Sequence, residues 1–159
     1  MDVYPLSPTL IRISGRDRVK WLHSFVTNEI RETTLYQWVE AFVTDSKGKT
    51  FSHGCIFRDD HAVYFLSVQP GQAERIITHW DRYIISEDVQ LGDFSSRFQW
   101  NFVATANVPS FVGQWNDHVP AIKSIEPSRL VQIRDDRPVL IQIPTFALGD
   151  HFTLVGIAA

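Results

Sequence analysis

The sequence predicts an α+β fold in which antiparallel sheets pack against a small number of helices. Three observations predict it. Segments of alternating apolar residues, which are typical of strands, outnumber segments with helical spacing. The strands between residues 37 and 68 follow one another through short turns, and short turns join only antiparallel neighbours. Helical segments do not alternate regularly with the strands, so a doubly wound parallel sheet is not indicated.

The first expected elements are a short strand over residues 9–14 and a helix over residues 17–26. Pro8 and Gly15 bound the strand, as is typical of strand ends. Ser14 or Asp17 is available to cap the start of the helix. The apolar stripe of the helix consists of Val19, Leu22, Phe25 and Val26. Thr27-Asn28 is interpreted as the turn that ends it, with a ligand contact as the alternative.

Three strands are expected next, over residues 37–44, 50–57 and 62–68. Asp45–Lys49 forms the first turn between them, with Gly48 able to adopt a positive φ, and residues 58–61 form the second. Two tight turns between three strands predict an antiparallel meander.

The clearest helix begins after Pro70-Gly71. Its apolar residues recur at helical spacing and are Ala73, Ile76, Ile77, Trp80 and Ile84. A short strand over residues 89–91 follows. The second half then predicts a strand at 98–104, a short helix at 108–115, and strands at 130–134, 139–143 and 152–157.

Length and composition limit the class of protein. The chain of 159 residues is long enough for one ordinary domain or one and a half small ones. A net charge of −3 offers no basic patch, so no direct contact with nucleic acid is expected. A single cysteine excludes an internal disulfide and fits a reducing compartment. The sequence shows no membrane-spanning apolar run and no signal peptide, so we expect a cytoplasmic protein without a membrane partner.

Three segments of the N-terminal half resemble those of a known family. They are Ile13-Ser-Gly-Arg-Asp17, Phe25-Val-Thr-Asn-Glu-Ile30 and Asp45-Ser-Lys-Gly-Lys49. In this order and spacing they resemble the folate-binding family that includes the glycine-cleavage T-protein, an aminomethyltransferase, and the YgfZ-type proteins. The likeness continues through residues 83–89, 138–143 and 151–156, and so spans nearly the whole chain. It implies tetrahydrofolate as the cofactor.

The resemblance also implies a domain organisation. Residues 1–159 correspond to the folate-binding domain, with a strand–helix unit at 1–34 and a ferredoxin-like part at about 36–159. The family's Glu-x-Gly segment, the cysteine motif of the YgfZ-type proteins and the C-terminal barrel domain have no counterpart in the sequence. We therefore expect either the N-terminal portion of a longer protein or a short variant.

The catalytic carboxylate of the aminomethyltransferases falls at Ser52 or His53. A serine hydroxyl is a poor base without a second group that activates it, whereas a histidine can accept a proton near neutral pH. Neighbours on a strand point to opposite faces, so only one of the two can face a site. Ser67 and Glu40 fall near family positions that contact the pterin, although the residue types differ. We expect no catalytic residue, and the candidate cofactor-binding residues are Glu40, Ser52, His53 and Ser67.

These replacements favour a non-catalytic, YgfZ-like protein that binds tetrahydrofolate. By resemblance, such a protein supports iron–sulfur protein maintenance or tRNA modification, with iron–sulfur enzymes as partners. One alternative is a divergent aminomethyltransferase whose site is completed by a further segment. Another is a dimerisation or interaction module without folate, in which two copies pair exposed sheet edges. Whether the chain is an enzyme stays open between these alternatives.

Other residues have a structural interpretation beside a functional one. Lys47-Gly-Lys49 fits a solvated turn or a loop that lines a folate channel. Cys55 is expected to be a buried, inert thiol. Trp21 and Trp80 fit the core, or offer a flat face to a pterin ring. We expect no metal site, because metal-ligand spacing is lacking among His23, His61, His79, His118 and His151.

Overall fold

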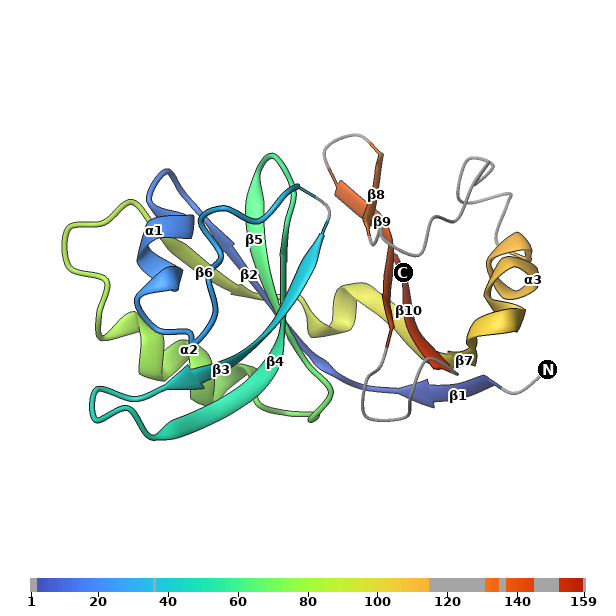
Figure 1. Cartoon of the computed structure of the whole chain (residues 1–159), viewed down its shortest axis with the longest axis horizontal. Coiled ribbons are helices and arrows are strands. Elements are labelled where there is room, and N and C mark those ends of the chain that lie inside the picture. The colour runs from blue at the N-terminus through green and yellow to red at the C-terminus, as the bar shows by residue number, and fades with distance from the viewer. Residues whose placement is uncertain (1–2, 36, 115–130, 135–136, 145–151, 159) are drawn as a thin grey trace. The chain divides into compact units, whose positions relative to one another are not determined.

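The computed structural model describes residues 3–35, 37–114, 131–134, 137–144 and 152–158. The chain divides into two compact units, Ser7–Ser96 and the combination of Met1–Leu6 with Arg97–Ala159. Each unit contains one five-stranded sheet, and the strand pairs of the described residues are antiparallel (Figure 1). The predicted α+β class with antiparallel sheets is therefore confirmed.

The sheet of the Ser7–Ser96 unit has the strand order β3-β4-β5-β2-β6. The strands are β2 (Thr9–Ser14), β3 (Trp38–Thr44), β4 (Thr50–Arg58), β5 (Ala62–Ser67) and β6 (Gln90–Asp93). The meander β3-β4-β5 lies where the sequence predicts it. Because β2 is hydrogen-bonded between β5 and β6, residues 9–14 belong to the same sheet as the meander. The compact units thus divide the chain at different residues from the 1–34 and 36–159 parts expected from the resemblance.

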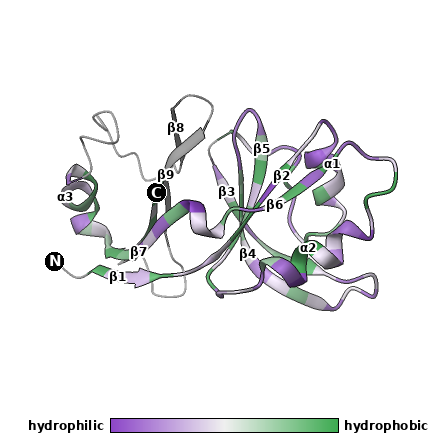
Figure 2. Ribbon diagram, turned by 180° about the vertical axis from the view of Figure 1, so that it is seen from behind, coloured by the Kyte–Doolittle hydropathy of each residue, from purple (hydrophilic) through white to green (hydrophobic). Residues whose placement is uncertain are grey.

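Two helices, α1 (Arg18–His23) and α2 (Ala73–Asp81), pack on one face of this sheet (Figure 1). Trp21 and Leu22 of α1 join Ile76 and Trp80 of α2 in a buried cluster with strand residues such as Ile56. Trp80 is fully buried, so its expected core position is confirmed. Figure 2 shows both hydrophobic and hydrophilic residues along α2, as an amphipathic helix requires.

Both helices are shorter than the apolar spacing predicts. The α1 helix ends at His23 and not at Val26, because the backbone from Phe25 onward bonds to β3. The α2 helix ends at Asp81. Beyond Arg82 the backbone hydrogen bonds span three residues and not four: Tyr83 N bonds to Trp80 O, and Ile84 N to Asp81 O. Ile84 still packs against the core from outside the helix. Apolar spacing therefore predicts burial correctly but not the helix ends.

Gly15 and Asp17 form a clamp with Asp88. Gly15 has a φ of 102°, and a Cβ placed there would lie 2.1 Å from the carbonyl oxygen of Asp88. The amide of Asp17 donates to that same oxygen at 3.1 Å. In return the amide of Asp88 donates to Asp17 Oδ2 at 2.9 Å, so this carboxylate joins the clamp and makes no hydrogen bond that caps α1. The first family-like segment therefore has a structural role.

Thr27 and Asn28 cover the free edge of β3. The amide of Thr27 donates to Phe42 O at 3.0 Å, and the amide of Phe42 donates to Thr27 Oγ1 at 3.0 Å. Asn28 Nδ2 donates to Glu40 O at 2.9 Å. An uncovered edge strand invites pairing with another chain, and these bonds occupy the groups that such pairing needs.

The turn between β3 and β4 is organised by Asp45. Its Oδ1 accepts the amides of Lys47 at 2.8 Å and Lys49 at 2.9 Å, and these bonds lower the pKa of the carboxyl. Gly48 has the expected positive φ, 77°. The third family-like segment is thus a stable hairpin turn.

The second unit has the strand order β1-β7-β10-β9-β8. Its elements are β1 (Val3–Leu6), β7 (Phe98–Ala104), a short 3-10 turn at Thr105–Asn107, α3 (Val108–Gly113), β8 (Val131–Arg134), β9 (Arg137–Pro144) and β10 (Phe152–Ala158). A further 3-10 turn, Ser95–Arg97, falls at the boundary between the two units in the sequence. The β1 strand was not predicted, because Pro5 interrupts a segment of only four residues. Trp115 and Leu130, at the expected ends of α3 and β8, lie outside the described residues.

The core of this unit lies between α3, β7 and β10. Its buried members are Val103, Val108, Phe111, Val112, Val155 and Ile157. None of the helices in the described ranges is both long and apolar enough to cross a membrane.

Candidate functional site

The four candidate residues lie on two faces of one sheet. Along β3 and β4, exposed and buried residues alternate. We call the exposed side the outer face; it carries Glu40, Phe42, His53 and Cys55. The other side, the helix-covered face, carries Ser52, Ala41, Val43 and Ile56, and three of these belong to the buried cluster with α1 and α2. The structure therefore brings Glu40 and His53 together and separates both from Ser52.

Glu40 and His53 form a close pair on the outer face. His53 Nε2 lies 2.6 Å from Glu40 Oε1, and both side chains are nearly half exposed, at 44% and 47%. The pair holds one imidazole nitrogen in a fixed direction, as a carboxylate does for the histidine in many proton-transferring sites. A carboxylate is thus present beside the position where the resemblance implied its loss, but it comes from β3 and not from β4.

Phe42 lies beside this pair and was not predicted as a site residue. Its ring is 4.7 Å from the His53 ring at an interplanar angle of 43°. The side chain is 45% exposed, a large exposure for a phenylalanine, and it lies on the edge strand β3. The sequence does indicate this position, because residues two apart on a strand lie on the same face and Phe42 is two residues after Glu40. Together the three residues offer a carboxylate, an imidazole and an aromatic ring to solvent.

Ser52 and Ser67 are both buried, at 6% and 1% exposure. Ser52 Oγ has no hydrogen-bond partner within the described part of the chain, so no group there activates it as a base or nucleophile. Ser67 Oγ accepts the amide of Gln69 at 3.4 Å, which belongs to the turn after β5. The role of all four candidates as folate ligands stays a prediction.

Cys55 has the environment of an inert thiol. Burial raises its pKa to about 12, and the nearby carboxylate of Glu40 raises it further in the same direction. The thiolate is the reactive form, so at neutral pH almost all of this thiol is unreactive. This agrees with the interpretation of Cys55 as a structural residue.

The described histidines have separate surroundings. His79 is buried and its ring stacks on Phe51 at 4.4 Å, while His23 lies 3.6 Å from a Glu29 oxygen. Over the described ranges, no three His, Cys, Asp or Glu side chains are placed to hold a metal ion. His118 and His151 lie outside the described residues.

The comparisons with known proteins show the fold. No family model matches the sequence, and no curated protein matches it. Among solved structures, the chain is similar to the aminomethyltransferase T of the glycine cleavage system from Bartonella henselae, with a TM-score of 0.74 and 11% identity. The likeness covers 98% of this chain and 41% of that protein, so the chain spans about two fifths of its length. The chain therefore has the fold of this part of an aminomethyltransferase T, in agreement with the resemblance in the sequence.

Proposed function

We propose that the chain binds a reduced folate and does not itself transfer an aminomethyl group. One observation carries this proposal: the likeness to an aminomethyltransferase T extends over 98% of the chain. The finer proposal, by resemblance, is a YgfZ-like protein of the cytoplasm that supports iron–sulfur protein maintenance or tRNA modification.

The outer face has the chemistry that a pterin ring requires. A pterin is flat, so an aromatic ring can stack on its face. It also carries neighbouring N–H groups, from which a carboxylate can accept two hydrogen bonds. Glu40 supplies the carboxylate and Phe42 the exposed ring. His53 bonds one Glu40 oxygen and leaves the other available to accept from a ligand. Ser52 and Ser67 are both buried, so this binding mode does not depend on either of them.

Titration calorimetry with tetrahydrofolate tests the proposal. Replacing Phe42→Ala removes a stacking face and should weaken binding about threefold to tenfold. Replacing Glu40→Gln removes a charged acceptor and should weaken it by about tenfold or more. Glu74→Gln, an exposed acid on α2, is the matched control and should bind like the unchanged protein. Absence of binding up to millimolar tetrahydrofolate would reject the proposal.

A divergent aminomethyltransferase is the second candidate, and the Glu40–His53 pair favours it. The pair offers a carboxylate and an imidazole that can accept a proton on the outer face, whereas Ser52, on the other face, offers only a hydroxyl. A turnover assay with the aminomethylated lipoyl carrier separates the two functions. The first proposal expects the background rate, whereas turnover that His53→Gln abolishes would establish the enzyme.

The third candidate, a dimerisation module without folate, has less support from the described residues. Pairing through the β3 edge would have to displace Thr27 and Asn28, which already bond that strand. Size-exclusion chromatography of the chain at tens of micromolar distinguishes a dimer from a monomer. A dimer that binds no tetrahydrofolate would favour this candidate over the other two.

A further inference from the structure

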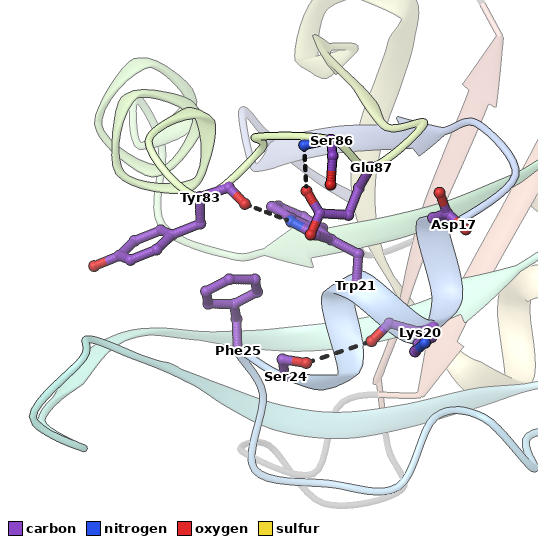
Figure 3. Close-up of a pocket in the computed structure, with 8 residues that line it drawn as sticks. All are labelled: Asp17, Lys20, Trp21, Ser24, Phe25, Tyr83, Ser86 and Glu87. Carbon is purple, nitrogen blue, oxygen red and sulfur yellow. Dashed lines mark hydrogen bonds between the residues drawn. The ribbon is translucent and has the colours of Figure 1, made fainter.

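A pocket of about 400 Å³ lies beside α1 and the segment after α2, a volume within the range of small-molecule sites. Figure 3 shows the eight residues that line it, which are Asp17, Lys20, Trp21, Ser24, Phe25, Tyr83, Ser86 and Glu87. All belong to the Ser7–Ser96 unit. Trp21 is part of the core on the helix-covered face, so this pocket is distinct from Glu40 and His53 on the outer face.

Three aromatic side chains form one end of the pocket. The Trp21 and Phe25 ring centres are 4.8 Å apart at 51°, and those of Phe25 and Tyr83 are 5.1 Å apart at 46°. The indole N–H of Trp21 donates to Tyr83 O at 3.2 Å. This donor is therefore already engaged, and the three residues offer ring surface together with the phenol hydroxyl of Tyr83.

Two carboxylates in the rest of the lining, Asp17 and Glu87, are held by backbone amides. In Figure 3 Asp17 and Lys20 lie away from the Phe25 and Tyr83 rings, with Glu87 between the two ends. Glu87 Oε2 accepts the amides of Ile85 and Ser86, each at 3.0 Å. Asp17 Oδ2 accepts the amide of Asp88 at 2.9 Å. Only one oxygen of each carboxylate takes part in these bonds, so the second keeps its capacity to accept.

The charge of the lining favours a cation. Backbone hydrogen bonds from Ile85, from Glu87 itself and from Ser86 lower the pKa of the Glu87 carboxyl, so that it is ionised at neutral pH. Lys20, on the exposed rim, is the single basic residue among the eight, against two acidic ones. The hydroxyl of Ser24 donates to Lys20 O at 3.5 Å and keeps its lone pairs for a ligand. Apart from the Lys20 ammonium and the hydroxyls of Tyr83 and Ser86, which can donate as well as accept, the polar groups of the lining accept.

We propose that this pocket binds an organic cation, an ammonium group carried on an aromatic or short aliphatic body. The body packs against Phe25 and Tyr83, where a nearby cation also gains from the negative faces of the rings. The ammonium group donates to the free oxygens of Asp17 and Glu87. Such a ligand has the opposite charge to the carboxylate-bearing tail of a folate, so this site and the proposed folate site can be tested separately.

Three probes of the same shape and different charge test the proposal. They are phenethylamine, 2-phenylethanol and 3-phenylpropanoate, titrated while backbone amide signals are followed by NMR. We expect the amine to bind at least about tenfold more tightly than the alcohol, and the anion not to bind. The shifted signals should be those of residues 17–25 and 83–88. Nα-acetyl-lysine methylamide, added as a fourth probe, distinguishes a lysine side chain of a peptide from a free aromatic amine as the source of the cation.

Single replacements assign the binding to the pocket. Glu87→Gln keeps the amide-accepting oxygen but removes the charge, and should weaken the amine about tenfold without changing the affinity for the alcohol. Phe25→Leu keeps an apolar side chain but removes the ring, and should weaken both. Glu74→Gln is the matched control and should change neither. Equal binding of the amine and the alcohol, or no binding of the amine at about 10 mM, would overturn the proposal.

Discussion

The clamp around Gly15 gives the sharpest prediction for stability. Gly15→Ala adds a Cβ that would lie 2.1 Å from Asp88 O, at a residue whose φ is 102°. The backbone conformation alone costs an L-residue about 1–2 kcal/mol. Moving the Asp88 backbone away from the new methyl group adds about 1–3 kcal/mol, as overpacking does in a core. We therefore expect the free energy of unfolding to fall by about 2–5 kcal/mol.

Gly48→Ala is the matched control for this prediction. Gly48 also has a positive φ, 77°, but nothing lies within 4 Å of an added Cβ. This replacement should therefore cost only the conformational part, about 1–2 kcal/mol. The difference between the two variants measures the close approach of Gly15 to Asp88.

Urea unfolding followed by tryptophan fluorescence provides the measurement. Both variants should unfold in one transition, with Gly15→Ala at the lower midpoint and with an unchanged slope. Equal losses of stability in the two variants would refute the clamp, because they would show that the contact with Asp88 contributes nothing beyond the φ requirement.

Three further predictions concern acid stability, thiol reactivity and the β3 edge. The hydrogen bond from the Arg16 amide is the main cause of the lowered pKa of the Asp88 carboxyl. The ionised carboxylate therefore stabilises the fold above its unfolded pKa of about 4, and this stability is lost as the pH falls through the folded pKa. In Asp88→Asn the free energy of unfolding, measured with urea at several pH values, should decrease less steeply toward acid pH. The same pH dependence in the variant and the unchanged protein would contradict this prediction. Cys55 is half-buried, and burial raises its pKa to about 12, so the thiol should react with Ellman's reagent much faster after unfolding than before it; equally rapid reaction of the native protein would contradict this prediction. Thr27→Val removes the acceptor for the Phe42 amide and should lower the free energy of unfolding by roughly 0.5–1.5 kcal/mol. It should also increase self-association on size-exclusion chromatography, because the β3 edge is less well covered. Thr78→Val, on the exposed side of α2, is the control.

The strands of the Ser7–Ser96 unit could be predicted from the sequence because their pattern is local. The alternation along β3 and β4 and the Asp45–Lys49 turn are contained within neighbouring residues. The β1 strand could not be predicted, since Val3–Leu6 is a strand only through its pairing with β7, about a hundred residues away. The end of α1 also depends on a distant contact, because residues after His23 bond to β3.

The candidate site was predictable only in part. Adjacent strand residues point to opposite faces, so the sequence indicates that Ser52 and His53 cannot share a site, and the structure agrees. It does not indicate which of the two is exposed, because that depends on where α1 and α2 pack. The pairing of His53 with Glu40 depends on the register of β3 against β4, which turn geometry and burial decide together. The pocket beside Trp21 could not be predicted from the sequence, because the spacing of Trp21 and Phe25 is equally typical of a helix that packs in a core.

The pairing of β1 with β7 has a consequence for how the polypeptide folds as it leaves the ribosome. The sheet that contains β3, β4 and β5 is built from one uninterrupted stretch, Ser7–Ser96, and can form as soon as that stretch has emerged. Val3–Leu6 is made before that stretch but has no partner until Phe98–Ala104 follows. Val3–Leu6 thus leaves the ribosome before the Ser7–Ser96 unit but reaches its place after it. A bulky group attached directly before Val3 would disturb the later-folding unit, not the unit that follows Val3–Leu6 in the sequence.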